Sequence, residues 1–298
     1  MSDNNLKAID FFCSGGGMTH GFRMAGIEVL AGIDNDSAVK ETYEKNNPST
    51  KFINADIFSF RTEELANETG IQPNDDNLIL IGCSPCQYWS IIRTDKTKSK
   101  MSKDLLKEFH RFVIHYKPGY VVVENVPGLE KKSSESGLDD FITDLEKMGY
   151  TVSSGVYDLS KFGVPQTRKR FSLIATRVRT QLICPTPEDD VVKVSDVLGT
   201  QNGFPEVPPG YRDNTSFQHT VSNLSNENIN VLKATPSNGG DSVKIRKKYK
   251  GKGFKDSYSR MSWDRPAPTI TTRFNSISNG RFAHPEEDRG LSLREGAT

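Results

Sequence analysis

The sequence has few cysteines, almost no net charge and no long apolar run. Its 298 residues include only 4 Cys, too few for a disulfide framework in a chain of this length, so we expect a protein of a reducing compartment, the cytoplasm. Lys and Arg total 39 against 38 Asp and Glu, and the resulting charge of +1 excludes a uniformly basic coat protein but allows a basic patch. No apolar run approaches the roughly 18 residues of a membrane span, and the first residues lack a signal-peptide pattern, so no membrane partner is expected.

The chain is 35% hydrophobic. Over its first 180 residues, short apolar runs typical of buried strands alternate with segments whose apolar residues have helical spacing. We predict buried strands at residues 7–13, 28–33, 78–82, 120–124 and 171–176. Amphipathic helices are predicted at residues 18–25, 36–46, 105–116 and 138–148. Strands that alternate with helices in this way predict an α/β fold with a doubly wound, mostly parallel sheet covered on both faces.

Proline and polar residues dominate beyond residue 182. Five prolines between residues 185 and 209 interrupt any long element, and residues 244–260 hold eight Lys or Arg against one acid. We predict a second, smaller, irregular domain over residues 183–280 that binds a polyanion, with a solvated charged loop as the alternative. Residues 1–182 would form a catalytic and cofactor-binding domain, and residues 281–298 a hinge and the start of a C-terminal segment.

Ligands of a doubly wound sheet bind beyond the carboxyl ends of its strands, so the residues there are the first candidates. Gly15, Gly16 and Gly17 follow the first strand, where the backbone can approach a cofactor, although a plain tight turn would use the same residues. Asp34 closes the next strand 19 residues after Gly15, where a carboxylate can accept ribose hydroxyls or cap a helix. Asp56 could bond an adenine amino group or be a surface acid.

Cys83 and Cys86 form a C-x-x-C pair after the strand at 78–82. A zinc site is disfavoured because no second Cys or His pair has ligand spacing, and a redox dithiol because Pro85 lies inside the pair. We interpret Cys86 as a single thiolate nucleophile, which needs an acid partner. Glu124 closes the next apolar strand, where poor solvation would favour its protonated form and make it a proton donor; a buried structural glutamate is the alternative.

Arg168 and Arg170, within Gln166–Arg170, precede the last predicted strand. Their guanidinium groups could orient Glu124, contact a substrate carbonyl or bind phosphate.

At these positions the chain resembles the DNA (cytosine-5)-methyltransferase family, from Asp10 to about Arg294. The resemblance rests on five segments in the family's order: Phe12–Gly16, Pro-Cys-Gln at 85–87, Glu-Asn-Val at 124–126, Q-x-R-x-R at 166–170 and Arg-Pro-Ala-Pro-Thr at 265–269. Ser14 stands where the family usually has glycine. The resemblance implies an S-adenosylmethionine-dependent methyltransferase sheet, and a target recognition region within the irregular second domain.

The resemblance implies transfer of a methyl group from S-adenosylmethionine to C5 of a cytosine in a specific double-stranded DNA sequence, as in a bacterial or phage restriction-modification system. Cys86 would add at C6 of a flipped-out base, Glu124 would protonate N3, and Arg168 and Arg170 would hold O2 and keep Glu124 in place. The product would be S-adenosylhomocysteine. Cofactor contacts carried over by position are Phe12, Gly16, Asp34, Asp56, Ile57, Pro85 and Leu105. Expected DNA contacts are Gln87, Ser90, Lys247 and Lys248.

Basic residues at 93–103, which lack apolar periodicity, predict either a mobile loop that closes over DNA or a merely solvated loop. Two other functions stay open: a tRNA cytosine-5 methyltransferase, whose signature is not seen, and a catalytically incomplete DNA-binding fragment or subunit of a split enzyme. The last is suggested by the family helix that starts at Leu293 and is cut short, so that a second chain would supply the remaining segment. A nicotinamide enzyme is disfavoured by the imperfect glycine pattern. We expect a nucleoid-associated monomer, with a cognate restriction endonuclease that acts on the same site without stable contact.

Overall fold

The computed structural model describes residues 5–85, 104–242 and 257–298. The chain forms two compact units. Unit 1 consists of Met1–Tyr157 and Lys169–Pro185, and unit 2 of Asp158–Arg168 and Thr186–Thr298. Residues 158–168 thus cluster with unit 2, although they lie within the expected first domain.

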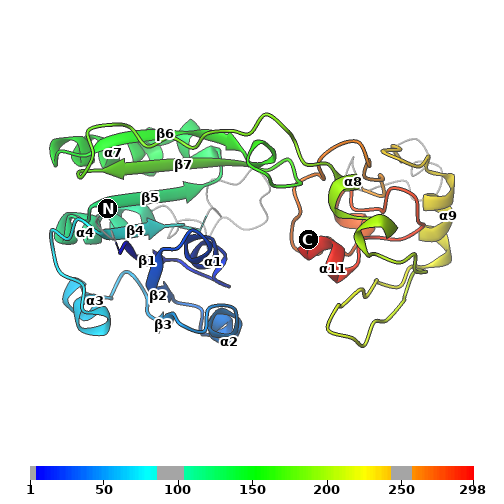
Figure 1. Cartoon of the computed structure of the whole chain (residues 1–298), viewed down its shortest axis with the longest axis horizontal. Helices are drawn as coiled ribbons and strands as arrows, with labels where there is room; N and C mark the ends of the chain where they lie inside the picture. The colour runs from blue at the N-terminus through cyan, green and yellow to red at the C-terminus, as the bar shows by residue number, and fades with distance from the viewer. Residues whose placement is uncertain (1–4, 86–103, 243–256) are drawn as a thin grey trace. The chain divides into compact units, whose positions relative to one another are not determined.

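Unit 1 is built on a seven-stranded sheet with the order β3-β2-β1-β4-β5-β7-β6 (Figure 1). β1 pairs in parallel with β2 and β4, β2 with β3, and β4 with β5, whereas β5 and β7 are antiparallel. The predicted α/β fold with a doubly wound, mostly parallel sheet is therefore confirmed. The strands are β1 Lys7–Phe11, β2 Glu28–Asp34, β3 Lys51–Asn54, β4 Leu78–Gly82, β5 Tyr120–Asn125, β6 Thr151–Asp158 and β7 Lys169–Thr176.

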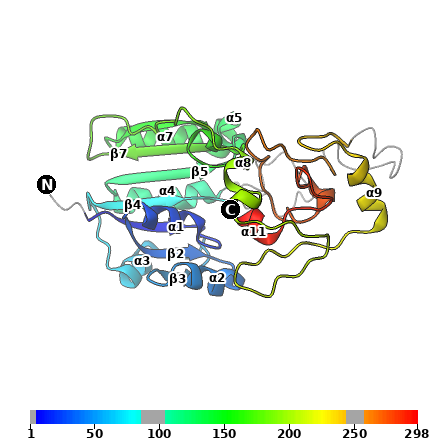
Figure 2. The ribbon, with the colours of Figure 1, turned by 45° about the vertical axis from the view of Figure 1, so that its right-hand side comes forward.

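Successive side chains of each central strand point to opposite faces of the sheet, and both faces are covered by packed residues. Leu78 and Leu80 of β4 join a large core with α3, α4 and α7, while Ile79 and Ile81 face a smaller cluster that includes α1. Figure 1 and Figure 2 show α4 and α7 close together along the sheet. The helices of unit 1 are α1 Gly17–Met24, η1 Ser37–Val39, α2 Lys40–Asn46, α3 Thr62–Thr69, α4 Leu105–Tyr116, α5 Gly128–Lys131, α6 Ser133–Ser136 and α7 Leu138–Lys147.

Unit 2 has short helices joined by irregular segments, and its interior is polar as well as apolar. The side chain of Arg260 is buried, and its guanidinium group donates to five acceptors: the carbonyl oxygens of Leu232, Thr235, His284 and Glu287 and the carboxylate of Asp288. One buried guanidinium thereby joins segments that no sheet connects. The helices of unit 2 are η3 Leu159–Lys161, α8 Val194–Val197, η4 Thr200–Asn202, α9 Asn226–Ala234, η5 Ile277–Asn279 and α11 Leu293–Ala297.

Within the three described ranges, every helix is too short or too polar to span a lipid bilayer.

Candidate active site

The turn after β1 is shaped by left-handed backbone. The first strand ends at Phe11, earlier than predicted, because Phe12 (φ 63°), Ser14 (φ 45°) and Gly16 (φ 87°) leave the extended conformation. A Cβ atom on Gly16 would lie 2.2 Å from Nδ2 of Asn47, whereas one on Gly17 would meet no described atom within 4 Å. Gly16 is therefore required for packing against the end of α2, a reason that the sequence did not suggest.

Asp34, at the end of β2, ties this turn to the neighbouring strand. Its Oδ2 accepts a hydrogen bond from the backbone N–H of Ser14 at 2.9 Å, and its Oδ1 accepts one from the N–H of Asp36, also at 2.9 Å. The following helical turn is capped by Asp36 instead, whose Oδ1 accepts from the N–H of Ala38 at 3.0 Å. The helix-cap interpretation of Asp34 is thus wrong, and its carboxylate keeps lone pairs for a ligand.

The other expected cofactor residues lie at the ends of neighbouring elements of unit 1. Asp56 is exposed, and its Oδ1 accepts from the N–H of Phe58 at 3.1 Å, while Ile57 is buried in the large core. Leu105 begins α4 and, like Phe12, is half-buried against the same core. Pro85 is exposed just after β4.

A fully buried carboxylate, Asp10, lies in the middle of β1. Its Oδ2 accepts hydrogen bonds from the backbone N–H and the hydroxyl of Thr19, at 3.1 and 2.7 Å. Its Oδ1 has no hydrogen-bond partner among the described residues. Burial raises the pKa of Asp10 to about 7. No role was predicted for Asp10, although an acid inside an otherwise apolar strand was a signal available in the sequence.

Glu124 and Arg170 meet at the carboxyl edge of β5. Because β7 is antiparallel to β5, with Phe171 opposite Asn125, the start of β7 lies beside the end of β5. Nε of Arg170 lies 2.9 Å from Oε1 of Glu124, and the two side chains are 19% and 31% exposed. Glu124 is thus half-buried, and its side chain is more exposed to solvent than we predicted. The guanidinium fixes the direction of the carboxylate.

Asn125 connects the ends of β4 and β5. Its Nδ2 donates to the carbonyl oxygen of Ser84 at 3.0 Å and faces the Ser84 hydroxyl at 3.1 Å, and its Oδ1 accepts from the N–H of Val126 at 2.8 Å. Asn125 is 2% exposed, so water cannot replace these bonds. They fix the backbone that leads through Pro85 to Cys86. This positioning role of Asn125 was not predicted from the Glu-Asn-Val segment.

Cys83 is a poor candidate for a thiolate. Burial raises the pKa of its thiol well above the usual range, and the nearby carboxyl groups of Asp10 and Glu124 act in the same direction. A dithiol partnership with Cys86 would require Cys83 to ionise, so the environment of Cys83 disfavours it. Five of the expected catalytic and DNA-contacting residues lie outside the described ranges, as does the basic segment at 93–103: Cys86, Gln87, Ser90, Lys247 and Lys248.

Two of the family-like segments meet in unit 2. The N–H of Thr167 donates to the carbonyl oxygen of Ala267 at 2.8 Å, and the N–H of Ile270 donates to Oε1 of Gln166 at 3.1 Å. Arg168 belongs to this unit, and its Nη1 donates to the carbonyl oxygen of Ile270 at 3.5 Å. Arg168 and Arg170 therefore belong to different units, and Arg170 shares unit 1 with Glu124.

The profile of the C-5 cytosine-specific DNA methylase family matches residues 6–298. The chain belongs to this family. It is a DNA cytosine-5 methyltransferase. The Type II methylase M.HgiDII of Herpetosiphon aurantiacus is 38% identical over 97% of this chain and 82% of its own length. The Type II methyltransferase M.NgoFVII of Neisseria gonorrhoeae is 29% identical, covering 99% of this chain and 77% of its own.

The fold of this methyltransferase is also found among solved structures. A crystal structure from an E. coli prophage, assigned as a DNA modification methyltransferase, superposes with a TM-score of 0.74. The alignment covers 97% of this chain and 86% of the prophage chain at 20% identity, so the likeness shows the fold.

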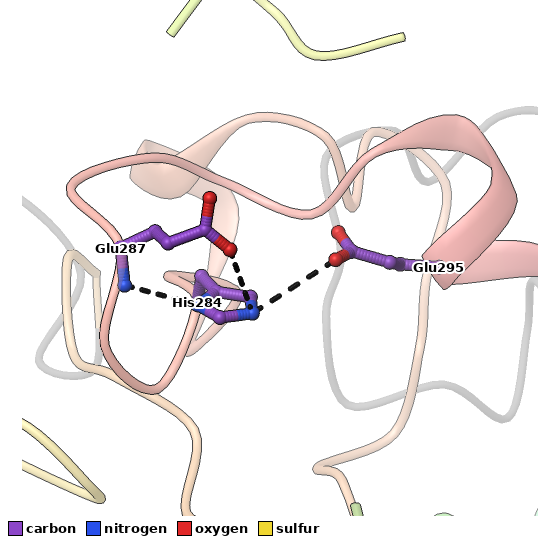
Figure 3. A group of neighbouring side chains, drawn as sticks. All are labelled: His284, Glu287 and Glu295. Atoms are coloured by element: carbon purple, nitrogen blue, oxygen red, sulfur yellow. Dashed lines mark hydrogen bonds and ion pairs between the residues drawn. The ribbon is translucent and has the colours of Figure 1, made fainter. Parts of the chain in front are cut away.

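One group of metal-ligand residue types lies in unit 2 of the methyltransferase: His284, Glu287 and Glu295 (Figure 3). The buried guanidinium of Arg289 already supplies the positive charge between these carboxylates. It donates to both of them at 2.6 to 2.9 Å and to the carbonyl oxygen of Gly290 at 3.0 Å. Nδ1 of His284 accepts from the N–H of Glu287 at 3.0 Å, and burial, reinforced by the charge of Arg289, lowers the pKa of His284 to about 4. The group is a charge-paired structural cluster of neutral histidine, guanidinium and carboxylates.

Proposed function

We propose that the chain transfers a methyl group from S-adenosylmethionine to C5 of a cytosine within a specific double-stranded DNA sequence. Its family and the Type II methylases among its relatives support this activity in a restriction-modification system. The observation that carries the proposal is the Glu124–Arg170 pair at the carboxyl edge of β5. It lies beside the strand end from which the chain leads to Cys86.

The carboxyl edge of unit 1 offers groups that suit the cofactor. Asp34 presents a partly exposed carboxylate for ribose hydroxyls, and Asp56 presents another for an adenine amino group. Phe12, Ile57 and Leu105 would add apolar contacts beside the turn at Gly16, and Pro85 would close the same edge. When bound, S-adenosylmethionine supplies an electrophilic methyl group on a sulfonium sulfur.

Cys86 and Glu124 would act on the cytosine together. The thiolate of Cys86 forms a bond to C6 while Glu124 gives a proton or strong hydrogen bond to N3, so that electron density moves to C5. C5 then takes the methyl group and loses its proton to water or hydroxide. As the C6–S bond breaks to restore the thiolate of Cys86, the proton at N3 would return to Glu124. The sulfur must approach from above the ring, so the base has to leave the duplex.

Arg170 holds the carboxyl group of Glu124 toward this chemistry. The ion pair would orient the carboxyl group for proton donation to N3 of the cytosine. Arg170 is the first candidate for a contact to O2 of the cytosine, and Arg168 is the second.

The test is covalent trapping on duplex DNA that carries 5-fluorocytosine, which cannot lose a proton from C5. Wild-type protein and Cys83→Ser are expected to form a denaturation-resistant adduct with S-adenosylmethionine present, and Cys86→Ser none. An equal yield from Cys86→Ser would refute the assignment of the nucleophile. Labelled methyl donor offered with duplex DNA or tRNA tests the substrate, and transfer to tRNA alone would overturn the DNA proposal.

A further inference from the structure

Asp56, the expected partner of the adenine amino group, lies on a tight turn between β3 and α3. Its Oδ1 accepts from the N–H of Phe58 at 3.1 Å. Its carbonyl oxygen accepts from the N–H of Ser59 at 3.0 Å and from that of Phe60 at 2.8 Å. These bonds fix the shape of the turn, but they all join residues within it, so they do not hold it against the rest of unit 1.

One side chain of α4 holds this turn from outside. Nη2 of Arg111 donates to the carbonyl oxygen of Ile57 at 2.8 Å and to that of Phe60 at 3.0 Å. An Nη atom carries two hydrogens, so a single nitrogen can bind both oxygens. Ile57 follows Asp56 directly in the chain, so these bonds fix the backbone beside the Asp56 carboxyl group.

The guanidinium of Arg111 is itself held in direction. Its Nε donates to Oε2 of Glu108, one turn earlier in α4, at 3.1 Å. Its Cζ lies 4.6 Å from the centroid of the Phe112 ring, close enough for a cation–π contact. The side chains of Arg111 and Glu108 are 39% and 26% exposed, so their ion pair is partly shielded from water. The guanidinium is therefore preorganised toward the turn, which lies 51 to 54 residues away in the sequence.

The same helix carries another expected cofactor contact. Leu105 is the first residue of α4, and Arg111 follows it in the same helix at a distance of about 9 Å along the axis. The rings of Phe60 and Phe112 stack between the turn and α4, with their centroids 6.0 Å apart. This apolar contact holds the turn close to the helix, whereas the two hydrogen bonds of Arg111 determine its direction. Arg111 thereby joins the segments that carry Asp56 and Leu105.

We propose that Arg111 is a positioning residue for the methyl donor, holding the turn of Asp56 so that its carboxylate can accept a hydrogen bond from the adenine amino group. The inference rests on the proposed function, which assigns Asp56 to adenine. Arg111 binds backbone oxygens, so it acts through Asp56 and not by touching the cofactor. A carboxylate fixed in this way distinguishes adenine from a purine without the amino group, and this discrimination should depend on Arg111.

The experiment compares two ligands of the full-length protein by titration calorimetry: S-adenosylhomocysteine and its analogue with hydrogen in place of the adenine amino group. The wild type is expected to bind the first about tenfold or more tightly, because the analogue lacks a hydrogen bond to a charged group. Asp56→Ala should bind both about equally. Arg111→Ala should lower the ratio to about threefold or less. Arg111→Lys keeps the charge without the planar guanidinium and should give an intermediate ratio.

The ratio separates positioning from general loosening, which would weaken both ligands to the same extent. Lys107→Ala removes an exposed charge from the same helix and is the matched control, which should keep the wild-type ratio. Arg111→Lys keeps the test decisive if Arg111→Ala is too unstable to bind either ligand.

The outcomes also separate this inference from the proposed function. A wild-type ratio in Arg111→Ala and Arg111→Lys, with the ratio lost in Asp56→Ala, would overturn the positioning role and leave the adenine contact standing. If the wild type itself does not discriminate, the adenine contact of Asp56 fails and the role of Arg111 with it. Methyl transfer to duplex DNA by the wild type is measured separately and decides the proposed activity.

Discussion

Asn125→Asp removes two contacts at the end of β5 while leaving the shape of the side chain almost unchanged. In the wild type, Nδ2 contacts the carbonyl and hydroxyl oxygens of Ser84, and Oδ1 accepts from the N–H of Val126. A carboxylate keeps the acceptor role but has no N–H to donate. The segment that leads from β4 to Cys86 thereby loses its connection to β5.

The free-energy cost of Asn125→Asp follows from the burial of these groups. Each buried hydrogen bond contributes about 1 kcal/mol, and a buried carbonyl left without a donor costs about 1–3 kcal/mol. With Asn125 only 2% exposed, we expect a total of about 3 kcal/mol for Asn125→Asp. Because Cys86 follows Ser84 by two residues, this loss should fall mainly on the position of the thiolate. It corresponds to a rate of methyl transfer lowered on the order of 100-fold.

Single-turnover transfer of a labelled methyl group to duplex DNA measures this effect. Binding of S-adenosylmethionine and the free energy of unfolding in urea are measured on the same samples, so that displacement of the segment is separated from unfolding. Ser84→Ala removes only the hydroxyl partner and is expected to cost about 1 kcal/mol, roughly a fivefold loss. Transfer by Asn125→Asp at the wild-type rate would refute the positioning role.

Four further changes test other parts of the structure. Arg170→Ala breaks the ion pair with Glu124, the proposed catalytic acid, and should lower kcat about 10- to 100-fold in steady-state kinetics, with partial recovery in Arg170→Lys. Gly16→Ala should lower the urea midpoint of unfolding because its Cβ would overlap α2, whereas Gly17→Ala, with open space around it, should not. The folded pKa of Asp10, about 7, exceeds its ordinary value of 3.8, so the folded protein binds an extra proton and loses stability as pH rises between these values. Asp10→Asn should remove the part of that loss that falls between pH 5 and pH 8, about 2.6 kcal/mol, when unfolding is compared at these two pH values. His284 has a folded pKa of about 4, below 6.5, so stability falls as pH drops through this window. His284→Asn, whose Oδ1 can accept the same backbone N–H, should show a smaller fall in Tm between pH 7 and pH 4.5.

The central elements were predictable because burial on both faces leaves a clear sequence pattern. The strand Leu78–Gly82 and the helix Leu105–Tyr116 have the predicted bounds. β3, α3 and β6 were missed. β3 and β6 are the two edges of the sheet, where only part of each strand is buried and no continuous apolar run forms.

Strand ends alone indicated where Glu124 should lie, but its partner depends on tertiary structure. Glu124 and Arg170 are 46 residues apart, and only the antiparallel pairing of β5 with β7 brings them together. The burial of Asp10 likewise depends on strands distant in sequence, because Asp10 lies between Gly32 of β2 and Ile81 of β4. The local sequence pattern indicates such residues as candidates, whereas long-range packing determines their protonation and their contacts.

The chain crosses from unit 2 back to unit 1 between Arg168 and Lys169, within a single family-like segment. A chimaera that exchanges the C-terminal part of the chain between relatives at one junction near residue 186 would separate residues 158–168 from the rest of unit 2. The bonds of Thr167 to Ala267 and of Gln166 to Ile270 would then join unrelated sequences. The unit that could be exchanged is discontinuous and consists of residues 158–168 together with residues 186–298. It includes Arg168 but not Arg170.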